Sequence, residues 1–293
     1  MPQAAQNVDT DKLIRNLRTV LEGLNHVVVP NPRIQRLRAH EISITSSLNA
    51  MAEAVLRECE DHDVGTEEWK SGIPDEFRFW WNVIARRTQA PDAKAFLEKF
   101  TLAHEFDYAG YIGDTDRSEL EVLDIGCAIF PAIGKKFGTK TIKVVAADPL
   151  AVGYNRLMDL FGIKRQYDLV FAVAEKTADI FGDERFDFVL AQNSIDHSYD
   201  PCAAFTQISR SIRKGGGARF EHFLNEAQNQ NYQGFHKWNL EPADGNRIRV
   251  WNRTSDSVFN FSDHGCTADV KPYIKKRAGV SDVQAFAVSI RKS

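Results

Sequence analysis

The sequence has little net charge, few cysteines and no long hydrophobic run, and each of these deficits excludes a class of protein. Its 37 lysines and arginines are balanced by 40 aspartates and glutamates, and the formal net charge of -3 provides no overall positive field for a nucleic-acid backbone. None of the four cysteines belongs to a Cys-x-x-Cys pair, and the N-terminus has no apolar stretch of the signal-peptide type, so we expect free thiols and a cytoplasmic location. No apolar run reaches the roughly 18 residues that a membrane-spanning helix needs, so we expect a soluble protein without a membrane span.

The first part of the chain has the pattern of helices. With 293 residues, of which 43% are hydrophobic, the chain can form one large domain or two smaller ones. Apolar residues recur at helical spacing over 13–24 and 48–59, and Pro74 and Pro91 are placed as first-turn residues of two further helices. We predict a helical region over 1–116 that acts as a lid or substrate wall. Its first helix also offers an apolar seam for oligomerisation, although such a short stretch usually packs within its own chain.

The second part, from residue 117 to 293, alternates short β-rich runs with segments of helix length. This alternation is typical of parallel βαβ units and predicts an α/β fold with a doubly wound, seven-stranded, mostly parallel sheet. The last two strands are expected to close one edge, and the basic run 271–277 is expected to be the solvated face of a helix. The predicted strands cover 121–126, 143–148, 168–173, 186–193, 217–223, 248–252 and 283–290.

The ends of the first two predicted strands carry residues that suit a nucleoside. Gly126 lies where the chain must turn sharply over the carboxyl end of the first strand, so a ligand could approach the backbone there. Asp148 ends the second strand, where a carboxylate can accept hydrogen bonds from both hydroxyls of a ribose. The alternatives are a plain turn at Gly126 and a helix cap at Asp148 ahead of Pro149.

With these residues the sequence resembles the class I S-adenosylmethionine-dependent methyltransferases, over roughly residues 117–224. The resemblance implies a Rossmann-like fold, S-adenosylmethionine as cofactor, and a site framed by particular residues. On this basis Asp124, Gly126, Cys127, Asp148, Ala174, Glu175, Gln192 and Asn193 are the expected cofactor-binding residues. The motifs that carry the resemblance are Asp124-Ile-Gly-Cys127, Asp148, Ala174-Glu175, 186–197 with Asp200-Pro201, and 208–216.

The cofactor loop departs from the family's usual Gly-x-Gly-x-Gly pattern. Ala128 and Phe130 stand at the second and third glycine positions, so the side chain of Phe130 must point away from the cofactor or shape its pocket. The nearby run 134–141 imitates a phosphate-binding loop, but its spacing is wrong and it precedes a strand, so we do not expect a nucleotide triphosphatase.

Methyl transfer requires the acceptor to be aligned and water to be excluded, and a hydroxyl acceptor also needs a base. His197 lies just beyond the fourth predicted strand, where the acceptor is expected, and we predict catalytic roles for His197, Asp196 and His236. A structural role for His197 is the alternative, and His222 is expected to be packed. Residues 196, 197, 221 and 222 could also hold a divalent cation, but no spacing requires it, so we predict no metal.

The polar segment 225–246 mixes side-chain amides with aromatic rings, which suits the hydroxyls and the apolar face of a sugar. It is similar to a subset of bacterial methyltransferases associated with polysaccharide or glycan assembly. We therefore expect O-methylation of a sugar-like or other small-molecule acceptor, with His236 and Trp238 directed toward it. The alternative for Trp238 is burial in the core.

Two other functions stay open. The altered loop at Ala128 and Phe130 would suit a noncatalytic scaffold of the methyltransferase fold. A nicotinamide-dependent oxidoreductase would also use an acid such as Asp148, but the missing Gly-x-Gly-x-x-Gly motif argues against it because a pyrophosphate needs close backbone amides.

Overall fold

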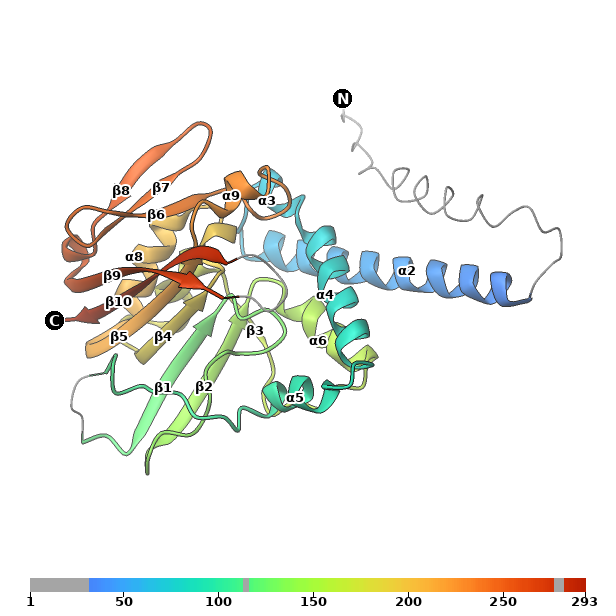
Figure 1. Ribbon diagram of the computed structural model, residues 1–293, viewed down its shortest axis with the longest axis horizontal. Helices are drawn as coiled ribbons and strands as arrows, with labels where there is room; N and C mark the ends of the chain where they lie inside the picture. The colour runs from blue at the N-terminus through green and yellow to red at the C-terminus, as the bar shows by residue number, and fades with distance from the viewer. Residues whose placement is uncertain (1–31, 113–115, 277–281) are drawn as a thin grey trace. The chain divides into compact units, whose positions relative to one another are not determined.

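The computed structural model describes residues 32–112, 116–276 and 282–293, with side chains from residue 43 onward (Figure 1). The chain forms two compact units, Met1–Ser47 and Leu48–Ser293. The described part of the first unit is the start of helix α2 (Pro32–Asp61), which continues into the second unit. The predicted helix over 13–24, with its candidate oligomer seam, lies outside the described residues. None of the described helices is long and apolar enough to cross a membrane.

The second unit is built on a seven-stranded sheet in the order β3-β2-β1-β4-β5-β10-β9. Strands β1 to β5 are parallel to one another, while β10 pairs antiparallel with both β5 and β9. The predicted doubly wound, mostly parallel sheet is therefore confirmed. The strands are β1 (Glu119–Ile125), β2 (Thr141–Asp148), β3 (Val170–Phe171), β4 (Phe186–Gln192), β5 (Ile212–Phe223), β9 (Cys266–Lys275) and β10 (Val283–Lys292).

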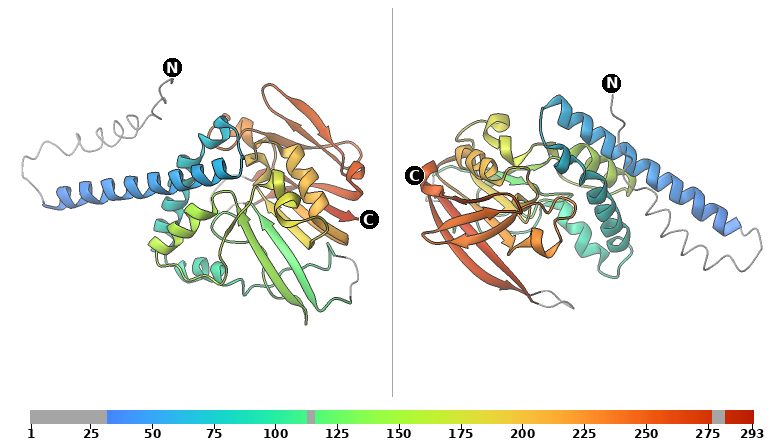
Figure 2. Two further views of the ribbon diagram at one scale, coloured as in Figure 1. Left: turned by 180° about the vertical axis from the view of Figure 1, so that it is seen from behind. Right: turned by 90° about the horizontal axis from the view of Figure 1, so that it is seen from above.

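Helices follow the strands and cover the two faces of the sheet, as Figure 2 shows from two further sides. Helix α8 follows β4 and begins at Pro201. Asp200 caps it, because the side chain of Asp200 accepts a hydrogen bond from the backbone N–H of Ala203. Helices α4 and α6 pack together through Phe77 and Tyr154, whose ring centroids are 5.4 Å apart. The helices are α3 (Glu67–Lys70), α4 (Ile73–Arg87), α5 (Ala93–Glu98), α6 (Ala151–Leu160), α7 (Thr177–Phe181), α8 (Pro201–Ser211) and α9 (Glu226–Asn229), with short 3-10 helices η1 (Lys99–Thr101), η2 (Ala174–Lys176), η3 (Ile195–His197) and η4 (Phe261–His264).

The core follows from the alternation of side chains along the central strands. Leu123 and Val189 point into the core cluster that includes α8, whereas Val122 and Phe188 belong to a cluster on the opposite face. Six of the seven residues of β4 are buried, which is typical of a strand covered on both faces.

Near the C-terminus, one predicted strand is confirmed but joins a different sheet, and one predicted helix is a strand. The segment predicted as strand 248–252 is β7 (Arg247–Trp251), which pairs with β6 (Asn239–Ala243) and β8 (Asp256–Phe259) in a separate three-stranded sheet. Residues 271–275 of the basic run predicted as a helix face belong to β9, the edge strand of the large sheet, and residue 277 lies outside the described residues. An edge strand tolerates Pro272 and the exposed Lys271, so this stretch of sequence lacks the apolar pattern that would predict a strand.

The strand order reverses between β1 and β4, so a crevice opens beyond their carboxyl ends. Residues 126–132 after β1 and 193–198 after β4 surround this crevice. The fold therefore brings together two segments that carry five of the eleven predicted site residues, namely Gly126, Cys127, Asn193, Asp196 and His197.

Candidate active site

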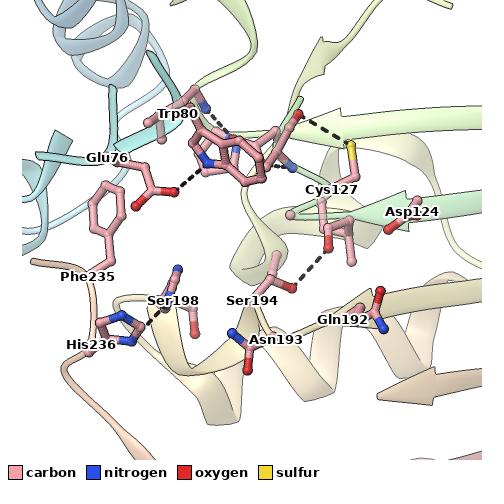
Figure 3. A pocket seen from close by; sticks show the side chains of 18 of the residues that line it. Glu76, Trp80, Asp124, Cys127, Gln192, Asn193, Ser194, Ser198, Phe235 and His236 are labelled. Carbon is pink, nitrogen blue, oxygen red and sulfur yellow. Dashed lines mark hydrogen bonds between the residues drawn. The ribbon is translucent and has the colours of Figure 1, made fainter. Parts of the chain in front are cut away.

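A pocket of about 640 Å³ lies beyond the carboxyl ends of β1, β2 and β4 (Figure 3). All eight predicted cofactor-binding residues line it, together with His197 and His236. The third residue for which we predict a catalytic role, Asp196, is buried directly behind the two histidines. The pocket is also lined by Trp69 and Glu76, for which the sequence predicts no site role, and by Trp80, which the helical spacing of its apolar neighbours predicts as a core residue rather than a wall of the site.

The loop after β1 is held by a buried carboxylate at the end of the strand. Asp124 accepts hydrogen bonds from the backbone N–H groups of Ala132 at 2.6 Å and Ile133 at 3.4 Å. Burial raises the pKa of Asp124 to about 7, against the lowering effect of these two hydrogen bonds. Asp124 therefore fixes the far end of the loop.

Gly126 and Ala128 both adopt left-handed backbone conformations, with φ of +70° and +53°. A side chain at Gly126 would meet Ser194, since an added Cβ would lie 2.5 Å from the Cβ of that residue. Cys127 lines the pocket between them, and burial raises the pKa of its thiol well above the usual value. The glycine is required here because the loop after β1 passes close to the loop after β4.

Phe130, at the third glycine position of the family pattern, packs its ring against Phe96, Phe100 and Trp80. Its ring centroid lies 5.5 Å from that of Phe100 and 6.3 Å from that of Trp80. The side chain thus forms part of the aromatic wall of the pocket.

Asp148 holds the start of the loop and the start of α6 at the same time. One carboxylate oxygen accepts a hydrogen bond from the N–H of Ala128 and the other from the N–H of Leu150, each at 2.8 Å. Burial raises its pKa to about 7. The N-cap residue of α6 is Leu150, so Asp148 precedes the helix cap, and its carboxylate lines the pocket.

Glu175, which follows β3, also holds the backbone through its side chain. Its Oε1 accepts hydrogen bonds from the N–H groups of Tyr199 at 2.6 Å and Asp200 at 3.2 Å, which joins the turn at Ala174 to the segment after β4. Burial raises the pKa of Glu175 to about 7.

Gln192 ends β4 and Asn193 follows it, and both line the pocket. The side-chain amide of Gln192 donates to Glu221 at 3.0 Å, and the backbone N–H of Asn193 donates to the carbonyl of the same residue at 2.7 Å. The side-chain Oδ1 of Asn193 is buried without a hydrogen-bond partner among the described residues. An unpartnered polar atom at the pocket floor fits a ligand that donates a hydrogen bond.

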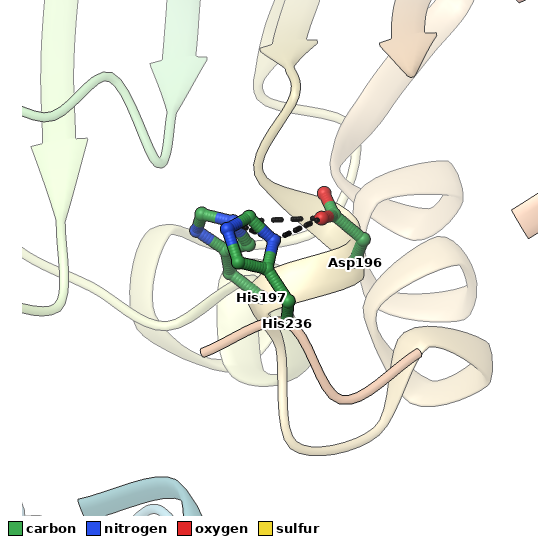
Figure 4. Close-up of side chains that lie close together, drawn as sticks. All are labelled: Asp196, His197 and His236. Carbon is green, nitrogen blue, oxygen red and sulfur yellow. Dashed lines mark hydrogen bonds and ion pairs between the residues drawn. The ribbon is translucent and has the colours of Figure 1, made fainter. Parts of the chain in front are cut away.

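Asp196, His197 and His236 form a compact cluster beside the pocket (Figure 4). His197 Nε2 lies 3.0 Å from His236 Nδ1, and Asp196 Oδ2 lies 3.3 Å from His236 Nδ1 and 3.4 Å from His197 Nε2. Burial lowers the pKa of His236, whereas the hydrogen bond to Asp196 and the charge of that carboxylate raise it. The net pKa of His236 lies above the usual value. Thirty-nine residues separate the two histidines, and only the folded chain brings them together.

His222 completes the surroundings of this cluster from strand β5. It is packed as predicted, with 2% of its surface exposed, and its Nδ1 lies 3.6 Å from Asp196 Oδ1. Neither ring nitrogen of His222 has a hydrogen-bond partner among the described residues.

The aromatic residues beside the cluster come from two distant segments. The indole N–H of Trp69 donates to the carbonyl of His197 at 2.7 Å, and its ring stacks on Phe235 with centroids 5.0 Å apart.

Trp238 does not line the pocket but packs against the core, so its expected direction toward the acceptor is wrong. Helix α4 contributes to both the core and the pocket. Its apolar spacing predicts the core face and does not indicate that Glu76 and Trp80 line the pocket.

The chain matches one known family over more than half of its length. The sequence profile of the family described as "Methyltransferase domain" matches residues 90–255 of the 293, so the chain belongs to this family. The protein is an S-adenosylmethionine-dependent methyltransferase, which confirms the expected class of enzyme and its cofactor. No relative is found among curated proteins.

Solved structures of similar fold include a SAM-dependent methyltransferase from Methanosarcina mazei, with 16% identity, a TM-score of 0.39, and coverage of 60% of this chain and 93% of that one. A SAM-dependent methyltransferase from Aquifex aeolicus has 14% identity and a TM-score of 0.36, covering 72% of this chain and 97% of that one. The CurJ carbon methyltransferase has 14% identity and a TM-score of 0.42, covering 61% of this chain and 50% of that one.

Proposed function

We propose that the protein transfers a methyl group to a hydroxyl oxygen of a small, sugar-like acceptor. The observation that carries this proposal is the cluster of Asp196, His197 and His236, which presents two imidazole rings to the pocket. A hydroxyl is a weak nucleophile until its proton is removed, and imidazole is the side chain best suited to accept a proton near neutral pH.

The residues around the loop after β1 fit the cofactor. We propose that Asp148 binds the ribose hydroxyls, that Ala174 and Glu175 lie along the adenine, and that Asp124, Gly126, Cys127, Gln192 and Asn193 form the rest of its site. The unpartnered Oδ1 of Asn193 and the close approach at Gly126 support this assignment. When bound, S-adenosylmethionine supplies an activated methyl group together with its own leaving group.

The remaining residues hold the acceptor and the proton. In our proposal a ring nitrogen of His197 or His236 accepts the hydroxyl proton, and Asp196 stabilises the ring that becomes charged. Phe235 and Trp69 exclude water from this end of the pocket. Water exclusion strengthens the charged interactions there.

The sugar-like character of the acceptor is supported by the other lining residues. Gln230 and Glu226 can pair with vicinal hydroxyls, while the rings of Trp80 and Phe235 can cover an apolar sugar face. We further propose that α3 and α4, which belong to the predicted helical region 1–116, serve as the substrate wall, since Trp69, Glu76 and Trp80 all line the pocket.

The cofactor part of the proposal is tested by calorimetric titration with S-adenosylmethionine and S-adenosylhomocysteine. Replacing Asp148 by Ala removes hydrogen bonds to a charged group, each worth about 1.5–3 kcal/mol, so we expect at least about tenfold weaker binding. Unchanged binding in Asp148→Ala would remove the ribose assignment.

The acceptor part is tested by screening glycosides, amines and thiols as acceptors and detecting methylated products by mass spectrometry. We expect transfer to hydroxyls, and a fall in turnover of about 100-fold or more in His197→Ala, because general-base catalysis contributes about 10²–10⁴. His62→Ala, an exposed histidine outside the pocket, is the matched control. Transfer to amines or thiols alone, or full turnover in His197→Ala, would contradict the proposal.

A further inference from the structure

The three ligand atoms of the Asp196–His197–His236 cluster form a nearly regular triangle. Its edges, which join His197 Nε2, His236 Nδ1 and Asp196 Oδ2, measure 3.0, 3.3 and 3.4 Å. Ligand atoms bound at about 2.0–2.2 Å to a divalent cation in tetrahedral or octahedral geometry stand about 2.9–3.5 Å from one another. The triangle therefore has the dimensions of one face of a metal coordination shell.

Hydrogen bonds alone do not explain three such short contacts. A neutral imidazole carries one proton, and a proton on His236 Nδ1 can point well toward Asp196 or toward His197, but not toward both. A cation in front of the triangle would satisfy all three atoms at once, because each would contribute a lone pair.

The charge of Asp196 leads to the same conclusion. This carboxylate is 2% exposed, and its ion-pair partners among the described residues are three histidines and no lysine or arginine. Imidazoles compensate the charge of a buried carboxylate only while they are protonated, whereas a divalent cation would compensate it with both rings neutral.

The outer surroundings also suit a metal site. The second oxygen of Asp196 is buried without a hydrogen-bond partner and faces His222 Nδ1 at 3.6 Å, while both ring nitrogens of His222 are unpartnered as well. A slight closing of this distance would let His222 donate to Asp196 and orient it, as outer-shell partners do for metal-binding carboxylates.

We propose that Asp196, His197 and His236 bind one divalent transition-metal cation whose remaining coordination positions face the pocket. Two imidazole nitrogens and one carboxylate oxygen favour ions such as Zn²⁺, Co²⁺, Ni²⁺ or Fe²⁺ over Mg²⁺ and Ca²⁺, which prefer oxygen ligands. His197 and His236 line the pocket, so an open position would be accessible to an acceptor hydroxyl. A hydroxyl bound to the cation would lose its proton to water more readily, and this ionisation would replace proton acceptance by the ring nitrogens, which the cation would occupy. This consequence rests on the hydroxyl acceptor of the proposed function, whereas the binding itself does not.

The proposal is tested by adding Zn²⁺ to chelator-treated full-length protein in a calorimetric titration and by recording the visible absorption spectrum with Co²⁺. We expect one cation per chain and no comparable binding of Mg²⁺. In His236→Ala and in the milder His236→Gln, we expect the affinity for Zn²⁺ to fall by at least about tenfold while the circular dichroism spectrum is unchanged. Two surface histidine variants, His62→Ala and His104→Ala, serve as controls and should bind as the wild type does.

Failure of the wild-type protein to bind Zn²⁺ or Co²⁺ would overturn the metal site. Equal binding by wild type and both His236 variants would also overturn it, since the cation would then lie elsewhere. The titration uses neither cofactor nor acceptor, so it can fail while hydroxyl methylation succeeds, and methylation can fail while the metal binds.

Discussion

Three carboxyl groups around the pocket are buried at points where they hold the backbone. Burial raises the pKa values of Asp124, Asp148 and Glu175 to about 7 in each case. The folded chain therefore retains protons that the unfolded chain releases above about pH 4. Because the folded state binds more protons, these groups contribute stability at low pH and lose it as the pH rises through about 7.

Glu175→Gln isolates the contribution of one of these groups. Oε1 alone accepts both backbone hydrogen bonds, so a glutamine can preserve them. Between pH 5 and pH 8 we expect the free energy of unfolding of the wild type to fall by about 2–3 kcal/mol more than that of Glu175→Gln. Urea denaturation at several pH values measures the difference, and Glu60→Gln on the exposed surface of α2 should match the wild type. Parallel pH profiles for wild type and Glu175→Gln would show that Glu175 is already ionised in the folded chain.

At the residue scale, the sequence predicts which side chains line the pocket wherever a local pattern marks them. Asp148 ends β2, while Gly126 and Glu175 follow β1 and β3, and the end of a strand can be recognised from neighbouring residues. Trp69, Glu76 and Phe235 carry no such mark, because their position in the pocket depends on how α3, α4 and the segment before β6 pack. Trp238 shows the reverse error, since an aromatic residue in a polar segment can equally be a core residue.

At the scale of elements, α4 and α6 approach closely because Gly153 has no side chain. A Cβ at Gly153 would overlap the ring of Phe77, which is fully buried. Helix α4 also contributes Glu76 and Trp80 to the pocket, so this contact helps to position the pocket wall.

Gly153→Ala should therefore destabilise the protein by about 1–3 kcal/mol, the usual effect of overpacking a core. Chemical denaturation gives the free energy of unfolding. Gly110→Ala is the matched control, because nothing lies within 4 Å of a Cβ at that position and we expect a change within about 0.5 kcal/mol. Equal stabilities of the two variants would mean that α4 and α6 can separate without loss.

The same scale explains the two misplaced elements. Strand β7 has a strand pattern and is a strand, but the pattern does not say which sheet it joins. Strand β9 is half exposed at the sheet edge, where Asp269, Lys271 and Pro272 are acceptable, so its residues lack the continuous apolar pattern of β4.

At the scale of the whole molecule, the pocket is contained in one of the two compact units. Every lining residue falls between Trp69 and Lys275, within Leu48–Ser293. We expect a chain lacking residues 1–47 to bind S-adenosylmethionine within about twofold of the full-length affinity, as measured by calorimetry.

A longer deletion provides the contrast. Removing residues 1–66 also removes Met51, Val55 and Cys59, which are buried against the helices that line the pocket. This chain should lose its cooperative thermal transition, because several large side chains leave the core together. If both deletions abolish cofactor binding, the first unit contributes to the pocket after all.

The sequence by itself determined the α/β fold, the methyltransferase family and the residues at the ends of β1, β2 and β4. The fold and these residues depend on local periodicity and on glycines and acids at fixed offsets from strands, and the family is indicated by the resemblance of its motifs, so none of them requires knowledge of a long-range contact. Only the tertiary structure decided that His236 joins Asp196 and His197, that α4 lines the pocket, and that β9 rather than β7 completes the large sheet. Such contacts join residues far apart in the chain, and they form because whole elements find the packing that buries the most apolar surface.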